Sequence, residues 1–361
     1  MGIKKMMILE RMNEQYKRIT NAIMDEESKK IFDSRIEYMI TRNEERFEEA
    51  LFDEKKDYYC LEIDSVLQGS GLDIVIFGVG KYGRKTNKNL SYCHKYVVKA
   101  YCDNDTDFIG KKIDDLPVLS PNDIVDDNSI IVVASQKYGE EMYNQLIGLG
   151  VDKNRIVTPV MGYLEIQCGW QYFDLFKPMQ REIFIDAGTF DGTTIIDFNR
   201  WLGKTTGFAY GMEPVREMYE VAIRRLQENK ITNAKIYECA AWNCNEKVNI
   251  RMDVKADGEI WGGSRISEDG TVTIKGKTID TLLEENESNV TFIKMDIEGS
   301  ELKALEGAAN SIKIYQPRLA ISLYHKPEDV LEIPTYILDL NPEYKLYLRH
   351  YTGDCNETVL Y

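Results

Sequence analysis

A short glycine turn between an apolar run and a helix constrains the fold of this chain most. The stretch 182–194, EIFIDAGTFDGTT, begins with the β-branched and aromatic residues 183–185, which predict a buried strand. Asp186 ends that run, and Gly188 and Gly192 form the turn before a helix. This order brings backbone close to a ligand and points the free amides of a helix start toward it. The stretch therefore predicts a pocket for a small polar molecule.

Two further apolar runs end in an acid. The run 208–214, FAYGMEP, stops at Glu213. In nucleotide-binding folds, the acid that binds the ribose hydroxyls stands about this many residues after the glycine turn. The run 292–308, FIKMDIEGSELKALEGA, reaches Asp296 and continues into a helix that Ser300 is placed to cap. Taken singly, each acid also fits a structural role at a strand end or helix cap. Together they predict parallel strands whose carboxylates converge on one crevice.

The three motifs resemble those of the FkbM family of S-adenosylmethionine-dependent methyltransferases. The resemblance rests on DAGTFDGTT, on the Glu213-Pro214 pair and above all on KMDIEGSELKALEGA. It covers about residues 171–361 and implies a seven-stranded Rossmann-like methyltransferase fold. The chain departs from the fuller Gly-x-Gly-x-Gly form of the donor motif, since Thr189 to Asp191 stand between only two glycines.

The resemblance also implies the residues that hold S-adenosyl-L-methionine. The glycine turn would hold the methionine end of the donor, a strand-end acid the ribose hydroxyls, and a backbone group the adenine, while a further acid lies near the methyl. The implied cofactor-binding residues, in that order, are Asp186, Gly188, Asp191, Gly192 and Thr193, then Glu213, Ala241 and Asp296.

His325 is the candidate proton acceptor of the reaction. It ends the apolar run 317–325 and is the histidine closest to the acid-terminated strands, whereas His94 and His350 lie apart from them. Asp296 is the alternative acceptor, and a structural role for the histidine stays open. The family is associated with O-methylation in glycan and secondary-metabolite pathways. The expected reaction is therefore methylation of a sugar, glycan or secondary-metabolite hydroxyl.

Residues 69–160 predict a smaller Rossmann-like α/β domain. A strand over 72–77 leads into Gly78-x-Gly80-x-x-Gly83, a complete G-x-G-x-x-G motif at a strand-to-helix junction. Asp103 follows a later strand, where an acid can face a ribose. The section resembles the nucleotide-binding-like domains that precede catalytic units in sugar-modifying enzymes, which implies a nucleotide or nucleotide sugar. A scaffold or oligomer interface is the equally weighted alternative.

Residues 1–68 predict several helices, because apolar positions recur near helical spacing and glycine and proline are almost absent. This segment packs on the next domain or serves as a dimerisation element. The third domain spans 161–361, and its first part is aromatic, with Trp170, Tyr172 and Phe173 expected in the core. A polar loop over 257–270 carries Ser264 and Arg265, which can hold a hydroxylated or anionic acceptor; a surface loop without such a role is the alternative.

Composition excludes several partners. A formal charge of −15 disfavours nucleic acid and anionic membranes, which require basic residues. No run is long enough to cross a bilayer and the start lacks a signal-peptide core, so a cytoplasmic protein is expected. No Cys-x-x-Cys pair or cysteine–histidine spacing predicts a metal site.

Two other classes of function stay open from the sequence alone. The Gly78 to Gly83 motif is also compatible with a dinucleotide-dependent or nucleotide-sugar-dependent enzyme in which the second α/β section binds substrate. A non-catalytic assembly protein is the other alternative. The presence of Asp186, Glu213 and Asp296 disfavours it.

Overall fold

The computed structural model describes residues 3–52, 58–67, 71–93, 96–135, 138–158, 170–252, 264–267 and 269–361. The chain divides into two compact units. The larger unit consists of Met1–Phe47 together with Tyr172–Tyr361, and the smaller unit is Glu48–Gln171. This division differs from the predicted three-part division, because the first helices join the C-terminal section.

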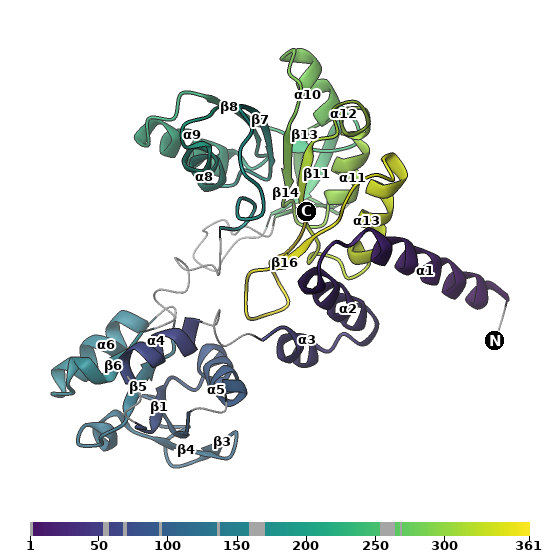
Figure 1. Ribbon diagram of the computed structural model, residues 1–361. Coiled ribbons are helices and arrows are strands. Elements are labelled where there is room, and N and C mark those ends of the chain that lie inside the picture. The colour runs from purple at the N-terminus through teal and green to yellow at the C-terminus, as the bar shows by residue number, and fades with distance from the viewer. Residues whose placement is uncertain are drawn as a thin grey trace. The chain divides into compact units, whose positions relative to one another are not determined.

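A seven-stranded sheet organises the larger unit (Figure 1). Its order is β16-β17-β15-β14-β7-β8-β9, with β14 in the middle and β7 beside it, parallel to both β14 and β8. The last two strands, β16 and β17, pair antiparallel with each other, and β17 pairs antiparallel with β15. The bounds are β7 Arg181–Ala187, β8 Thr206–Met212, β9 Ala234–Tyr237, β14 Phe292–Met295, β15 Arg318–Ser322, β16 Leu348–His350 and β17 Thr358–Leu360.

Helices separate the parallel strands, so the predicted Rossmann-like α/β architecture is confirmed. A small four-stranded sheet, of order β10-β13-β11-β12, is inserted between β9 and β14. The helices are α8 Thr193–Leu202, α9 Arg216–Glu228, α10 Ile279–Glu285, α11 Glu301–Glu306, α12 Ala309–Tyr315 and α13 Asp329–Leu340. The strands of the small sheet are β10 Ala240–Ala241, β11 Lys247–Arg251, β12 Arg265–Ile266 and β13 Val272–Lys277.

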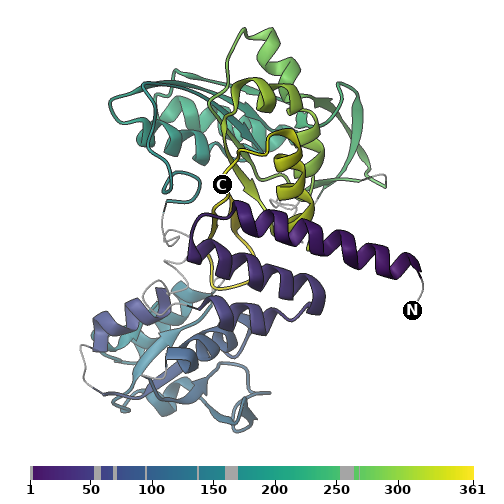
Figure 2. The same ribbon diagram turned by 45° about the vertical axis from the view of Figure 1, so that its right-hand side comes forward.

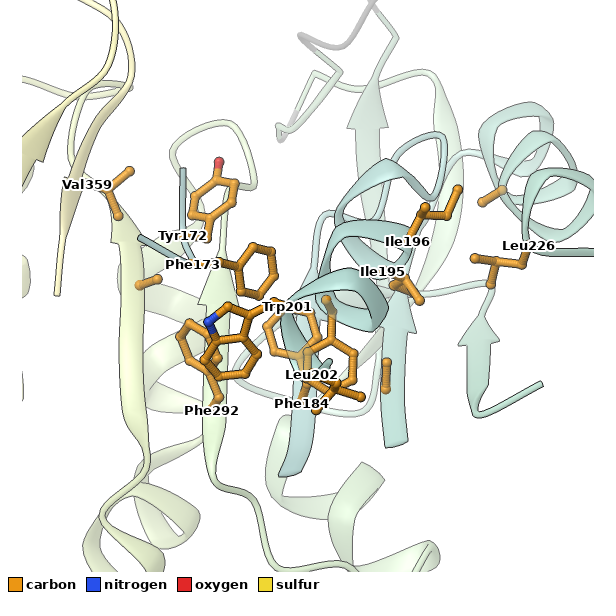
Figure 3. Close-up of a cluster of buried hydrophobic side chains, with 14 of the residues drawn as sticks. Tyr172, Phe173, Phe184, Ile195, Ile196, Trp201, Leu202, Leu226, Phe292 and Val359 are labelled. Carbon is orange, nitrogen blue, oxygen red and sulfur yellow. The ribbon is translucent and has the colours of Figure 1, made fainter. Parts of the chain in front are cut away.

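An aromatic cluster fills the core between the central strands and α8 (Figure 3). Phe184 of β7 stacks on Phe198 of α8 with ring centroids 4.8 Å apart, and Phe173 meets Phe292 edge to face. Such pairs stabilise a core beyond the apolar area that they bury. The expected core positions Tyr172 and Phe173 are buried, whereas Trp170 is 40% exposed.

The N-terminal helices α1 Ile3–Ala22 and α2 Glu26–Thr41 pack on this same unit (Figures 1 and 2). They lie against α13 and β16 and are followed by α3 Glu44–Leu51. Arg35 of α2 is 3% exposed and its Nε donates to the hydroxyl of Thr358 in β17 at 2.8 Å. Ile19 and Ile31 are also buried, so part of the predicted apolar stripe packs within the chain itself. Dimerisation through this segment stays a prediction.

The smaller unit is built on a six-stranded sheet of order β3-β4-β2-β1-β5-β6. All neighbours pair in parallel except β3 with β4, which confirms a second, smaller α/β sheet. Its strands are β1 Ile74–Phe77, β2 Val98–Cys102, β3 Lys112–Ile113, β4 Leu116–Leu119, β5 Ile130–Val133 and β6 Ile156–Val157. Its helices are α4 Tyr58–Leu67, α5 Lys81–Cys93 and α6 Gly139–Gly148, with 3-10 turns over Pro121–Ile124 and Lys153–Arg155.

Candidate functional site

A cavity of about 260 Å³ opens in the larger unit where the central strands end. The turn after β7, the segment after β8 and the segment after β14 all reach it, because β7 lies between the other two strands. Residues from β10, β11 and β12 close another side. Its polar lining comprises Glu213, Ser264, Asp296, Glu298, Ser300, Tyr324 and Glu357.

Glu213 is held in place by backbone amides. Its Oε2 accepts a hydrogen bond from the amide of Phe190 and its Oε1 one from the amide of Val215, each at 2.8 Å. The side chain is buried, and burial raises the pKa of Glu213 to about 7, against the opposing effect of these two amides. Each carboxylate oxygen keeps a second lone pair, so the group can also accept hydroxyl donors from a ligand.

Gly188 lets the turn after β7 approach the neighbouring strand. Its φ of +81° lies in the left-handed region, and a Cβ at this position would stand 1.9 Å from the carbonyl oxygen of Asp296. Every other side chain would therefore push the two segments apart. The carbonyl of Gly188 also accepts a hydrogen bond from Nζ of Lys294 at 2.8 Å. Gly188 thus ties the turn to the end of β14.

Asp186 lies beneath the cavity and does not line it. Its side chain is fully buried, and its Oδ1 lies 3.0 Å from Nζ of Lys294, which is itself buried. Burial raises the pKa of Asp186 although the charge of Lys294 opposes this shift. The pair therefore stabilises the junction of β7 and β14 from below.

Asp296 presents its carboxylate to the cavity. The hydroxyl of Tyr172 donates to Oδ2 at 2.8 Å, and the hydroxyl of Tyr324 donates to Oδ1 at 2.9 Å. Burial would raise the pKa of Asp296, but the charges of Lys294 and His325 and the two hydroxyl donors hold it below its usual value. Asp296 is therefore an oriented, ionised carboxylate at the cavity wall.

His325 lies behind that wall, among carboxylates. Its Nδ1 is 2.9 Å from Oε1 of Glu301, and its Nε2 is 3.4 Å from Oδ1 of Asp296 and 3.5 Å from Oε2 of Glu298. Burial would lower the pKa of His325, but its contact with Glu301 and the surrounding negative charges raise the pKa to about 9. His325 is absent from the lining, so it reaches the cavity through Asp296.

Several residues around the cavity have positive φ angles without being glycine. Phe190 (φ 48°), Glu298 (φ 55°) and Glu357 (φ 56°) line it, and Tyr172 (φ 72°) donates to Asp296. Such conformations cost free energy in side-chain-bearing residues and persist where the surrounding structure enforces them. They concentrate at functional sites, which agrees with a binding role for this cavity.

Comparison with known proteins identifies the larger unit. Residues 186–346 match the methyltransferase FkbM domain, and residues 71–157 match the C2185-like N-terminal domain. Residues 186–346 belong to the FkbM methyltransferase family. No curated protein matches the chain.

Several solved structures match parts of the chain, among them the following three. A methyltransferase FkbM from Methylobacillus flagellatus KT has 21% identity and a TM-score of 0.46, over 83% of this chain and 92% of that chain. An rRNA methylase from Streptococcus thermophilus has 14% identity and a TM-score of 0.31, over 50% and 84%. A SAM-dependent methyltransferase from Aquifex aeolicus has 13% identity and a TM-score of 0.26, over 50% and 81%.

The larger unit thus contains a methyltransferase FkbM domain, a domain whose methyl donor is S-adenosylmethionine. The residues present fit that cofactor. Glu213 stands after β8 with free lone pairs for ribose hydroxyls, and Gly188 leaves the backbone of the turn accessible where a Cβ would collide. Met212 and Ala241 give the cavity an apolar wall suited to a nucleoside base.

The structure brings only part of the predicted FkbM donor set to the cavity. Gly188, Glu213, Ala241 and Asp296 line it. Asp191 instead accepts hydrogen bonds from the amide and hydroxyl of Thr193 and pairs with Arg225, so it serves the start of α8. The predicted residues that do not line the cavity are Asp186, Asp191, Gly192, Thr193 and His325. Direct cofactor contacts by these residues stay predictions.

Sequence reasoning missed several residues that shape the FkbM site. Lys294 carried a usable signal, because a lysine inside an apolar strand run is seldom buried without a partner. Tyr172 and Tyr324 carried none, since their hydroxyls meet Asp296 only after folding. The same holds for Phe190, Glu298 and Glu357, whose approach to the cavity depends on turn geometry.

In the smaller unit, the G-x-G-x-x-G turn lies beside a cavity of about 400 Å³ lined by Gly78, Gly80, Asp103 and Ser135, among others. Gly83 is needed for packing, because a Cβ there would stand 1.8 Å from the carbonyl oxygen of Gly78. Oδ2 of Asp103 accepts a hydrogen bond from the amide of Val79 at 2.8 Å. The structure thus brings Gly78, Gly80 and Asp103 to one cavity, and Asp103 accepts its hydrogen bond from the turn itself.

Proposed function

We propose that the larger unit methylates a hydroxyl oxygen, with a sugar, glycan or secondary-metabolite hydroxyl as the acceptor. The observation that carries the proposal is Asp296, an ionised carboxylate that two tyrosine hydroxyls orient at the wall of the donor cavity. A hydroxyl acceptor loses its proton during or after transfer, so it requires a nearby base. An amine acceptor that is already unprotonated when it binds needs a nearby base less.

S-adenosylmethionine, when bound, supplies an electrophilic methyl group on a sulfonium. The residues of the chain position the donor and the acceptor. Glu213 would accept the ribose hydroxyls of the bound donor, and the turn at Gly188 would leave room for it close to β14. In-line displacement requires the acceptor oxygen to lie against the methyl, so fixing both partners in one cavity provides most of the acceleration.

Asp296 then orients the acceptor. One of its carboxylate oxygens accepts the hydrogen bond of the acceptor hydroxyl, while Tyr172 and Tyr324 prevent the carboxylate from rotating. As the oxygen attacks, its proton passes to Asp296. His325 lies behind the wall, with its Nε2 3.4 Å from Oδ1 of the same carboxylate.

The test uses the full-length protein, S-adenosylmethionine with a deuterated methyl group, and a small-molecule extract that includes sugars. Mass spectrometry of the products with fragmentation locates the label. Label on oxygen of a hydroxylated acceptor supports the proposal, and label only on nitrogen contradicts it. Asp296→Asn should lose transfer while it keeps donor affinity, since Glu213 and Gly188 are untouched.

A second candidate function concerns the smaller unit. We propose a nucleotide or nucleotide-sugar site there, because its cavity adjoins Gly78 and Gly80 at the start of α5. Calorimetry of the full-length protein with UDP and, separately, NAD tests this proposal. Binding of either that Gly80→Asp removes supports it, and absence of binding contradicts it. The donor affinity of the larger unit serves as the control.

A further inference from the structure

Three metal-ligating side chains from different segments converge behind the cavity of the larger unit. Asp296 follows β14, Glu301 begins α11, and His325 follows β15. One ligand atom from each can be chosen so that all three lie within 4.8 Å of one another. The side chain of Glu301 is fully buried, that of His325 is 7% exposed, and that of Asp296 is 22% exposed.

The buried polar atoms of this group lack hydrogen-bond partners. Both ring nitrogens of His325 and Oε2 of Glu301 are buried without one in the described part of the chain. Nδ1 of His325 and Oε1 of Glu301 stand 2.9 Å apart, so the ring and this carboxylate face each other directly. Buried polar groups are normally satisfied, so a histidine and carboxylates that face one another in this way point to a cation that they share.

Neighbouring groups orient the carboxylates as they do around bound metals. Tyr172 and Tyr324 donate to Asp296, and the amide of Ile297 donates to Oε1 of Glu301 at 2.9 Å. Hydrogen bonds of this kind fix ligand orientation in metal sites. Glu298 adds a third negative charge 3.5 Å from Nε2 of His325. The pocket is therefore rigid, polar and rich in negative charge.

We propose that Asp296, Glu301 and His325 bind a divalent transition-metal cation. Two carboxylates and one imidazole form a donor set suited to Mn²⁺, Fe²⁺ or Zn²⁺. The site goes beyond the proposed methyl transfer and is defined by its own residues. Asp296 connects the two, because it also lines the donor cavity. A cation bound here would hold that carboxylate in place from behind.

The sequence alone gives no indication of this site. Its ligands lie on separate elements, with Glu301 five positions and His325 29 positions after Asp296, so no short motif announces them. Folding brings them together because β14 and β15 are neighbouring parallel strands whose carboxyl ends meet.

The experiment is a titration of the full-length protein with MnCl₂ after treatment with a chelator. Free Mn²⁺ is followed by electron paramagnetic resonance, and the heat of binding by calorimetry. Wild type should bind one Mn²⁺ per chain, and His325→Gln and Glu301→Gln should each weaken binding by at least about tenfold. Glu306→Gln is the matched control, because Glu306 lies on the same helix and pairs with Lys303 at the surface. It should leave Mn²⁺ affinity unchanged.

Two outcomes would overturn the proposal. One is the absence of saturable Mn²⁺ and Zn²⁺ binding by wild type, a result that does not depend on the folding of any variant. The other is equal Mn²⁺ affinity of wild type and a His325→Gln variant that retains the wild-type circular dichroism spectrum. A third measurement tests the competing occupant, a proton on His325. If nitrogen-15 resonances show both ring nitrogens protonated with and without saturating Zn²⁺, which is diamagnetic, the metal assignment is wrong.

Discussion

Lys294 stands directly beside Asp186 in the parallel register of β14 and β7, and its Nζ lies 3.0 Å from Oδ1 of that aspartate. Both side chains are buried beneath the methyl-donor cavity. Removing one partner leaves the other charge buried and uncompensated, which typically costs about 3–5 kcal/mol. Lys294→Met should therefore lower the free energy of unfolding by this amount in urea denaturation.

The matched control for this prediction is the exposed pair of Lys303 with Glu306. Exposed pairs contribute about 0–1 kcal/mol, so Lys303→Met should be nearly neutral. The double variant Asp186→Leu with Lys294→Met should recover part of the stability, because no buried charge remains. Equal destabilisation by Lys294→Met and Lys303→Met would show that the buried pair does not stabilise the junction.

Glu213 gives donor binding a pH dependence. Its pKa of about 7 means that the carboxylate, the form that accepts ribose hydroxyls, forms only as pH rises through neutrality. Donor affinity should be about tenfold weaker at about pH 6 than at about pH 8. Calorimetry with S-adenosylmethionine measures the change. Glu213→Gln should bind weakly at both pH values, and a wild-type affinity that is flat across this range contradicts the assignment.

The raised pKa of Glu213 also makes the stability of the fold depend on pH, with the opposite sign. Because the folded pKa of Glu213 lies above its ordinary value of 4.5, the folded protein keeps a proton that the unfolded chain has released between these values. The contribution of Glu213 to stability therefore falls as pH rises from about 4.5 to 7. Comparing the urea midpoints of wild type and Glu213→Gln across this range isolates the effect. A difference that does not change with pH speaks against a raised pKa.

Gly188→Ala should abolish donor binding. The added Cβ would stand 1.9 Å from the carbonyl oxygen of Asp296, at a φ that disfavours alanine. The turn must shift, and with it the backbone that faces the donor. Gly148→Ala is the control, because a Cβ there meets nothing within 4 Å. Donor affinity equal to wild type in the Gly188 variant would show that this turn does not form the donor site.

Arg35 joins the N-terminal helices to the methyltransferase sheet. Its guanidinium donates to the hydroxyl of Thr358 and, at 2.6 Å, to the carbonyl of Cys355. Arg35→Met leaves these buried acceptors with fewer donors, so it should destabilise the larger unit by about 2–4 kcal/mol. Arg18→Met, which removes an exposed pair with Asp339, should change little. Similar unfolding curves for the two variants would argue that α2 is dispensable.

The sequence predicted the architecture well, because strand patterns and glycine turns are local signals. It placed β7, β8 and β14 and the acids at their carboxyl ends, and the register confirms that these strands are neighbours. It did not predict which way each acid points. Asp186 and Glu213 end similar apolar runs, yet one faces a buried lysine and the other the cavity. That distinction depends on cross-strand register, which no single segment encodes.

The surroundings of the histidines and the domain boundaries were also not predictable from the sequence, because they depend on contacts between separate segments. His325 reaches three carboxylates from two other segments, so its surroundings depend on the folded sheet. His94 lies outside the described residues, and His350 contacts Thr358 at 2.8 Å. The first helices were expected to form a separate section up to residue 68, but residues up to Phe47 pack with the methyltransferase unit.

Across the described residues, none of the helices has the length and hydropathy that a bilayer crossing requires.

The central claim is that one methyl donor binds beside Glu213 and Asp296. Calorimetric titration of the full-length protein with S-adenosylmethionine, in parallel for wild type, Glu213→Ala and the surface control Glu306→Gln, tests it most directly. Wild type and the control should each bind one S-adenosylmethionine per chain, and Glu213→Ala should show no measurable binding. Undiminished affinity in Glu213→Ala would contradict it.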